Sequence, residues 1–261
     1  PAPSSRAAVP LQVRLGLAST VVGPRVRPPT RHSRWRFKAL ACVECAVTEH
    51  DHALFAAVYD PATALVEATV FGPHRRYLTN GLRGRVLDVG AGTGATVPFF
   101  AAARAAARRD GSNLDVHLLD PDPHTRTRAR RAARDAGLDA PVVGGRAESL
   151  PYPDDSFDAV VSALVGCTVA DLDAALDEVA RVLRPGGEFR FFEHVAADGL
   201  QGRVQTFVDP AWTRVAAGCH LDRDLETAYR AHPGLDVRTL ERHRGIPPAS
   251  PMIRGVAVTV D

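Results

Sequence analysis

From about residue 50 onward, the chain alternates between two hydrophobic patterns. Short runs rich in Val, Leu and Phe are separated by longer segments whose apolar positions recur every three or four residues. Strands that alternate with helices in this way are typical of a parallel sheet covered by helices on both faces. The pattern therefore predicts an α/β protein built around one open sheet.

The same pattern places the individual elements. Seven strands are expected, at residues 85–90, 115–120, 140–145, 157–164, 187–195, 236–244 and 252–260. Helices are expected at 96–109, 123–136, 171–183, 200–217 and 222–232, after a leading helical segment broken at Pro61 and near Gly72. Because no helix separates the last two strands, one of them is predicted to be antiparallel in an otherwise parallel sheet.

The first 46 residues differ from the rest of the chain. They have prolines every few residues and no sustained period, so we expect a disordered basic leader, with residues 47–261 as the folded domain. Residues 1–43 contain seven Arg and one Lys and no acid, so the formal charge of +2 leaves about −6 for the remainder. The composition resembles a transit peptide, and an extension upstream of a start at Val47 is the alternative.

Composition also narrows the class of protein. No apolar run approaches the roughly 20 residues that cross a bilayer, so we expect no transmembrane segment. The remainder of the chain has a net negative charge, which argues against a nucleic-acid partner for this domain. Four scattered cysteines do not make a disulfide framework, so a reducing, cytoplasmic location is expected, for a monomer or homodimer.

The cysteines raise a separate question of metal binding. Cys42 and Cys45 are followed by His50 and His52, which are donor types that zinc uses. The gap between the two pairs is shorter than in the usual finger, so we expect no metal there. The isolated Cys167 and Cys219 are expected to be small packing residues, since free cysteine is among the most buried residue types.

The stretch VLDVGAGTG, residues 86–94, carries the strongest chemical signal. Gly90, Gly92 and Gly94 allow a strand to turn sharply into a helix with its backbone N–H groups facing a ligand. Asp88 precedes this turn and would be a costly buried charge without a cationic partner. A ligand with an ammonium group would suit Asp88, whereas a pyrophosphate would be repelled.

A second acid follows the next predicted strand. Asp120, in HLLDPDP, would point to the same edge of the sheet and could accept hydrogen bonds from both hydroxyls of a ribose. It lies thirty positions beyond Gly90, whereas the dinucleotide fingerprint places its acid about 20 residues on. The alternative is that Asp120 only forms a turn before Pro121.

Four motifs in order resemble one known family. VLDVGAGTG, LLDPDP, GRAESLPYPDDSFDAVVSAL and LRPGG, within residues 55–195, are similar to the class I S-adenosylmethionine-dependent methyltransferases. The resemblance implies their Rossmann-like fold, with a seven-stranded, mostly parallel sheet, and S-adenosylmethionine as cofactor. It implies cofactor contacts from Tyr59, Asp88, Gly90, Ala91, Gly92, Thr93, Gly94, Asp120, Pro121, Ala147, Glu148, Ser162 and Leu164.

A narrower resemblance concerns the methyl acceptor. FFEHV, VDPAW and GCHL are similar to the thiol-methylating branch of methyltransferase-like proteins and to their bacterial relatives, whose cousins include quinone C-methyltransferases. The chain differs from that branch at Thr96, where Asn is common, and by the lack of its hydrophobic leading helix. The resemblance implies a small-molecule acceptor such as a thiol, a quinol or a phenol.

Methyl transfer is an in-line displacement, so most of the catalysis can come from alignment of the reactants. A thiol with a pKa near 8.5 loses its proton easily to an imidazole, and His194 and His220 are the candidate catalytic bases. The alternative for each is a histidine that is merely hydrogen-bonded. Glu193 is either a supporting partner or a surface charge, and Phe207 and Trp212 line either a substrate pocket or the core.

Two other functions use the same features. A nicotinamide-dependent dehydrogenase would have a similar sheet, but Asp88 and the late Asp120 disfavour it. A non-catalytic cofactor-binding protein could act on nucleic acid through its basic arm, which has the charge but few aromatic residues for stacking.

Overall fold

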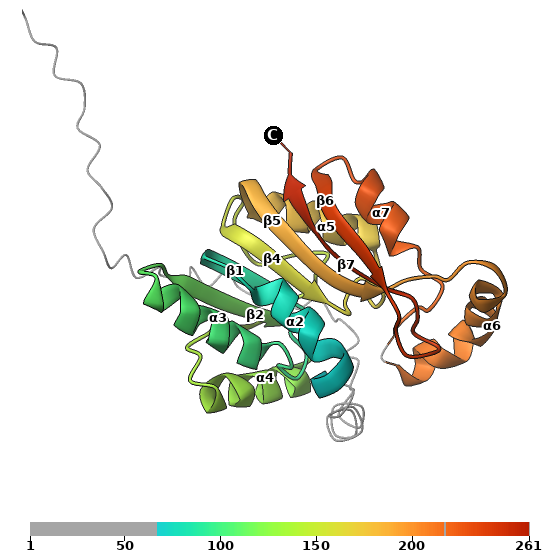
Figure 1. The fold of residues 1–261 in the computed structure, drawn as a ribbon, viewed down its shortest axis with the longest axis horizontal. Helices are drawn as coiled ribbons and strands as arrows, with labels where there is room; N and C mark the ends of the chain where they lie inside the picture. Colours follow the sequence, from blue (N-terminus) through green and yellow to red (C-terminus); the bar gives the residue numbers. More distant parts are fainter. Residues whose placement is uncertain (1–66, 217, 261) are drawn as a thin grey trace, which may run out of the picture. The chain divides into compact units, whose positions relative to one another are not determined.

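The computed structural model describes residues 67–216 and 218–260, all within the compact unit Thr48–Asp261. Its centre is one seven-stranded sheet in the order β3-β2-β1-β4-β5-β7-β6 (Figure 1). The strands are β1 Gly84–Val89, β2 Leu114–Asp120, β3 Val142–Gly144, β4 Phe157–Ala163, β5 Leu183–His194, β6 Leu235–His243 and β7 Met252–Thr259. The helices are the π-helix η1 Glu67–Phe71, then α2 Gly72–Thr79, α3 Val97–Arg109, α4 Pro123–Asp135, α5 Leu172–Val182, α6 Gly199–Val215 and α7 Leu225–Ala231.

The strand directions confirm the predicted sheet. β1 pairs in parallel with β2 and β4, β2 with β3, and β4 with β5. β7 is antiparallel to both of its neighbours, β5 and β6. The α/β fold with seven strands and one reversed strand therefore agrees with the sequence pattern.

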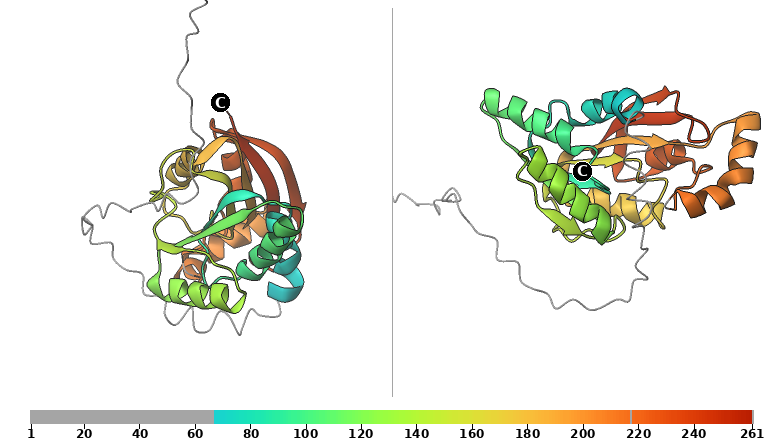
Figure 2. Two further views of the ribbon diagram at one scale, coloured as in Figure 1. Left: turned by 90° about the vertical axis from the view of Figure 1, so that its left-hand side faces the viewer. Right: turned by 90° about the horizontal axis from the view of Figure 1, so that it is seen from below.

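The core consists of two apolar layers, one on each face of the sheet. One layer joins Val86 and neighbouring strand residues to α2, α3 and α4, with Phe100 fully buried. The other joins Leu87 and its neighbours to α5 and α7, where Tyr229 is buried against Phe191. Because adjacent strand residues point to opposite faces, these continuous apolar strands are buried on both sides. Figure 2 shows helices on the two faces of the sheet. Each large buried side chain contributes about 1.5–3 kcal/mol.

Some helix boundaries differ from the sequence prediction. The expected break near Gly72 is a change of pitch instead, because η1 runs directly into α2 and Pro73 occupies its first turn, where no N–H is needed. The break at Pro61 lies outside the described residues. α7 begins only at Leu225, because the Asp224 carboxylate caps it by accepting from the Thr227 N–H at 3.1 Å.

β5 begins at Leu183, four residues earlier than predicted from 187–195. The LRPGG stretch looks like a turn, but it is held to the end of β7. The hydroxyl of Thr259 accepts from Gly187 N–H at 3.1 Å and donates to Arg184 C=O at 2.9 Å. Leu183 pairs with Phe157 of β4, and the proline–glycine segment then forms an irregularity before pairing resumes at Glu188.

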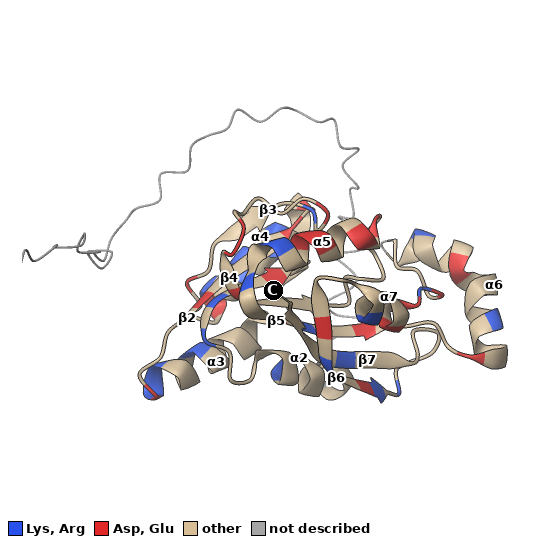
Figure 3. Cartoon of the chain, turned by 90° about the horizontal axis from the view of Figure 1, so that it is seen from above, with Lys and Arg blue, Asp and Glu red and all other residues tan. Residues whose placement is uncertain are grey.

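All loops that follow the parallel strands lie at the same edge of the sheet, where α/β proteins bind ligands. The loop between β6 and β7 lies at this edge too, because His194 and His243 both pair with Met252. Charges of both signs are mixed over the view in Figure 3, with arginines on α3 and α4 and acids on α5. Among the described residues, no helix has the length and apolar character to span a membrane.

Candidate active site

The glycine turn after β1 has the backbone conformation that its sequence requires. Gly90, Gly92 and Gly94 all have positive φ, at 64°, 56° and 92°. A Cβ built on Gly90 would lie 2.5 Å from a methyl carbon of Val165, so the loop after β4 packs directly on the turn. Only glycine tolerates both the left-handed backbone and this close approach.

Asp120 ends β2 and holds the turn in place. Its carboxylate accepts the Gly92 N–H at 2.8 Å with one oxygen. The other oxygen accepts the Asp122 N–H at 2.9 Å and the Thr125 hydroxyl at 2.5 Å. A carboxylate has about four acceptor positions, so capacity remains for the ribose hydroxyls of a cofactor. The sequence argument predicted the ribose contact but not the link to Gly92.

Asp88 is 1% exposed, beneath the turn. Burial raises the pKa of this carboxyl to about 7, the nearby Arg75 partly opposes that rise, and Asp120 adds to it. Arg75 is itself buried and donates to the Thr96 hydroxyl at 2.7 Å. Arg75 thus supplies part of the positive charge that Asp88 needs, and no motif in the sequence pointed to it.

The loop after β4 closes the site from the other side. Leu164 has φ of 65°, a left-handed conformation rare for a branched side chain, and its N–H is tied to Phe192 C=O at 2.8 Å. This bend turns Val165 back toward Gly90. Strained backbone of this kind costs about 1–3 kcal/mol and concentrates at functional sites.

Beneath that loop lies a buried carboxyl, Glu193, which is 0% exposed at the end of β5. One oxygen accepts from the Ser162 hydroxyl at 2.7 Å and from Val165 N–H at 3.2 Å. Burial raises the pKa of Glu193, and these hydrogen bonds limit the rise. Glu193 is therefore a buried support of the loop, not a surface charge.

The remaining predicted cofactor residues lie along the same edge. Ala147 is buried, Pro121 is exposed and Ala91 N–H bonds to Leu119 C=O. Glu148 accepts the Ala170 N–H at 2.8 Å and so joins the loop after β3 to the start of α5. Thr93 is half-buried within the turn. Tyr59 lies outside the described residues, as do Cys42, Cys45, His50 and His52.

The two candidate bases occupy different surroundings. His194 is 2% exposed, and its Nε2 lies 2.9 Å from the sulfur of Cys219. Its Nδ1 is buried and has no hydrogen-bond partner among the described residues. These contacts do not support a role for His194 as a base that the acceptor reaches directly.

His220 is accessible and oriented. Its Nδ1 lies 3.1 Å from Asp209 Oδ2, and its side chain is 43% exposed. The other Asp209 oxygen accepts the Leu221 N–H at 2.6 Å, which fixes the carboxylate on α6. His220 N–H bonds to Cys167 C=O at 2.9 Å, so this pair lies beside the loop that contacts the glycine turn. An imidazole held by a carboxylate is suited to accept a proton. Asp222 also approaches His220 and Asp209, a set with mainly oxygen donors.

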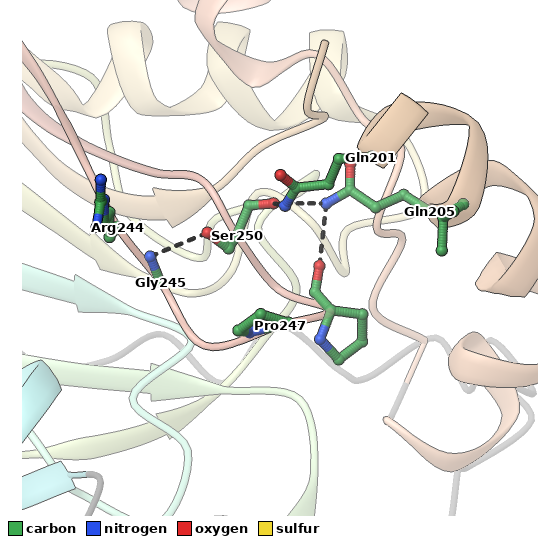
Figure 4. Close-up of a pocket in the computed structure, with 8 residues that line it drawn as sticks. Gln201, Gln205, Arg244, Gly245, Pro247 and Ser250 are labelled. Carbon is green, nitrogen blue, oxygen red and sulfur yellow. Dashed lines mark hydrogen bonds between the residues drawn. The ribbon is translucent and has the colours of Figure 1, made fainter. Parts of the chain in front are cut away.

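A pocket of about 700 Å³ lies farther along the same edge, between α6 and the loop that joins β6 to β7 (Figure 4). Gln205 crosses it, with its side-chain NH₂ bonded to Pro248 C=O at 3.0 Å and Ser250 C=O at 2.9 Å. Its walls include Val204 and Pro247, with Arg244 as the charged member. The two aromatic candidates differ: Trp212 packs against the core, whereas Phe207 is 85% exposed on α6 and is neither core nor pocket lining.

The residues present fit S-adenosylmethionine on structural grounds. Asp88 Oδ2 is buried without a hydrogen-bond partner among the described residues, and such an orphaned acceptor suits an ammonium group. The glycine turn leaves no side chain between the backbone and a ligand, and Asp120 suits a diol. The individual contacts of these residues with the cofactor stay predictions.

Comparison with known proteins gives an independent result. A sequence profile described as a methyltransferase domain matches residues 87–191. Human thiol S-methyltransferase TMT1A is 31% identical over 175 residues, which is 65% of this chain and 68% of the relative. A phosphatidylethanolamine N-methyltransferase of Cereibacter sphaeroides is 33% identical over 188 residues, 69% of this chain and 84% of the relative.

Solved structures agree on the fold. The crystal structure of a methyltransferase from Thermotoga maritima, titled a possible histamine N-methyltransferase, superposes with a TM-score of 0.59 at 19% identity, over 82% of this chain and 99% of that one. At this identity the likeness concerns the fold alone. The matched segments span about half to two thirds of the length of the first curated relatives, so the acceptors of those relatives do not transfer directly.

Proposed function

This chain belongs to the class I S-adenosylmethionine-dependent methyltransferases, and from that premise we propose that its acceptor is a small-molecule thiol. The observation that carries the proposal is the His220–Asp209 pair, beside the loop that packs on the glycine turn. The relative TMT1A is a thiol S-methyltransferase by name, which supports the same acceptor class.

Acidity favours a thiol over a hydroxyl at this pair. An ordinary thiol has a pKa near 8.5 and a phenol has a pKa near 10, whereas the conjugate acid of imidazole has a pKa near 6.5. Proton transfer from an ordinary thiol to an ordinary imidazole is therefore uphill by only about 2 pKa units. The thiolate that forms is also the stronger nucleophile toward carbon. A base of this strength suits a thiol better than a phenol or an alcohol.

Each residue of the site then has a distinct task. The cofactor supplies an electrophilic methyl group on a positively charged sulfur. Asp120 would hold the ribose and the glycine turn together, and Asp88 would face the amino group. Val165 packs on Gly90 and limits how the two reactants can align, which is the main source of catalysis in a displacement. His220 would accept the acceptor's proton while Asp209 keeps its imidazole oriented.

The pocket between α6 and the β6–β7 loop is the proposed seat of the acceptor's apolar part. It adjoins the end of β5, since Gln205 bonds to Ser250 while Val195 N–H bonds to Pro251 C=O. Its apolar walls and single Arg244 suit a hydrophobic acceptor with a neutral or anionic rim. Such a pocket also suits a quinol or phenol, which is the runner-up acceptor.

The experiment compares matched pairs of acceptors that differ only in sulfur or oxygen, such as thiophenol with phenol and an alkanethiol with its alcohol. The full chain is incubated with methyl-labelled cofactor, and transfer is quantified for each. We expect transfer to the thiols at rates at least tenfold above their oxygen counterparts. Equal rates, or transfer to quinols alone, would overturn the thiol assignment, and calorimetric binding of the cofactor shows that the protein is competent.

A further inference from the structure

Two sulfur atoms and one imidazole nitrogen, which are good ligands for a soft metal ion, lie close together beside the proposed active site. The sulfurs of Cys167 and Cys219 and a ring nitrogen of His194 all lie within 4.8 Å of one another. The three residues are 2%, 9% and 2% exposed. They come from the loop after β4, the end of β5 and the loop after α6, so only the fold brings them together.

The surrounding scaffold fixes these segments. His220 N–H bonds to Cys167 C=O at 2.9 Å, which joins the segments that carry the two cysteines. The Arg223 guanidinium donates to Gly166 C=O at 2.8 Å and Val169 C=O at 2.7 Å, on both sides of Cys167. The backbone C=O of Arg223 accepts from Ala196 N–H, just after His194. Hydrogen bonds to the main chain therefore fix the three segments that carry the cluster.

The sulfur of Cys219 is surrounded by donors. His194 Nε2 lies 2.9 Å away and Trp212 Nε1–H donates to it at 3.3 Å. Two nitrogen atoms therefore approach this sulfur, and a thiolate is the form in which cysteine coordinates a metal ion.

We propose that Cys167, His194 and Cys219 form a binding site for a thiophilic divalent cation, with Zn²⁺ as the expected ion. Thiolate and imidazole are the donors that zinc prefers, and two thiolates balance its charge. On binding, any proton on either sulfur or on the His194 ring nitrogen that faces them is released to solvent, and both thiolates and the imidazole each give a lone pair to the ion. The donors of a tetrahedral zinc lie about 3.5–4 Å apart, so only small side-chain movements are needed.

The position of this site suggests what it does. Cys167 lies two residues after Val165, whose side chain contacts Gly90 in the turn, so the ion would be close to the methyl donor. Three protein donors leave one tetrahedral position, which in catalytic zinc sites is taken by water or substrate. This part of the inference rests on the proposed function: the acceptor thiol would reach the ion from the side of Cys219, the most exposed of the three ligands, supply the fourth donor and lose its proton more easily.

The test uses cobalt as a spectroscopic probe for zinc, with the full chain. Titration with Co²⁺ is expected to give a thiolate-to-cobalt absorption band in the near ultraviolet and tetrahedral bands in the visible, at one ion per chain. Cys167→Ser and Cys219→Ser should each lose these bands or require more than about tenfold more cobalt, and Trp212→Phe should weaken binding by about tenfold.

The other two cysteines provide the matched control. Cys42→Ser with Cys45→Ser removes a CxxC pair outside the described residues and should leave the cobalt spectrum unchanged. If instead this double variant loses the bands while Cys167→Ser and Cys219→Ser keep them, the proposal is overturned. Circular dichroism and cofactor binding by each variant show whether it is folded, so loss of the spectrum cannot be mistaken for unfolding.

A second measurement separates this inference from the proposed function. Addition of a small thiol to the cobalt protein should shift the visible bands, whether or not methyl transfer is detected. Cobalt binding without methylation leaves the metal site standing and rejects the thiol substrate. Undiminished thiol methylation by protein that binds no metal ion rejects the metal site and leaves the proposed function standing.

Discussion

The sheet has two functionally different halves. The cofactor half consists of β1, β2 and β3 with the turns that follow them, and its chemistry lies in short continuous motifs. The half proposed to bind the acceptor, called the acceptor half below, consists of β5, α6 and the loop from β6 to β7, where Asp209, His220 and the cysteine–histidine cluster come from separate segments. A cofactor shared by many enzymes needs one fixed local arrangement, whereas an acceptor site can be assembled in many ways.

Both halves bury a carboxyl, but they compensate for it differently. Asp88 in the cofactor half has Arg75 nearby, and one of its oxygens lacks a hydrogen bond. Glu193 in the acceptor half also has one oxygen without a hydrogen bond among the described residues, but its other oxygen accepts from the Ser162 hydroxyl and Val165 N–H and so supports the loop over the glycine turn. We therefore propose a ligand-binding role for Asp88, whereas Glu193 holds a loop of the protein itself.

The largest expected effect is a loss of stability where Val165 packs on the glycine turn. Gly90→Ala places a Cβ 2.5 Å from Val165 and imposes a left-handed backbone on alanine, so the free energy of unfolding should fall by about 3 kcal/mol. Gly111→Ala has the same kind of backbone in open space and should cost about 1 kcal/mol. Urea denaturation measures both, and equal losses would mean that Val165 does not pack on the turn.

A substitution confined to the acceptor half should leave the affinity for the cofactor unchanged. His220→Gln removes the proposed base, so kcat with a thiol of high pKa should fall about 100-fold, while cofactor affinity stays unchanged. Acidic thiols, already ionised at the assay pH, should lose little. A uniform loss with all thiols would show that His220 has another role, and Asp209→Asn should give the same pattern more weakly.

A substitution confined to the cofactor half should instead lower the affinity for the cofactor. Asp120→Asn weakens the acceptors for Gly92 N–H and for the ribose, so cofactor affinity should fall about 30-fold by calorimetry. Asp122→Ala is the control, because it removes the cap of α4 and should cost about 1 kcal/mol of stability with little change in affinity. Unchanged affinity in Asp120→Asn would separate this acid from the cofactor.

The smallest expected effect is a pH dependence in the cofactor half. Asp88 has a raised pKa of about 7, so its contribution to folding stability is fully present below 3.8 and is lost as the pH rises through 7. A bound ammonium group favours the ionised carboxyl, so cofactor affinity should instead increase about tenfold between pH 5.5 and 7, with proton release. Calorimetry in buffers of different ionisation enthalpy detects that proton, and Asp88→Asn should abolish both effects.

Much of the fold was predictable because it depends on local pattern. Continuous apolar runs such as 157–164 read as strands buried on both faces, and the three glycines read as the turn that binds a ligand. The start of β5 was misjudged, because Leu183 pairs with Phe157 of β4 and the segment after it is held by Thr259, more than seventy residues farther along the chain. Phe207 was misjudged as well, because helical spacing alone does not say which face of α6 meets the protein.

By itself, the sequence determined the α/β sheet, the reversed strand, the glycine turn and the family, because strand period, turn chemistry and short motifs are properties of neighbouring residues. Only the tertiary structure decided that Arg75 lies near Asp88, that Val165 packs on Gly90 and that the cysteine sulfurs face His194. These contacts join residues far apart in the chain, and what brings them together is the burial of two apolar layers against one sheet.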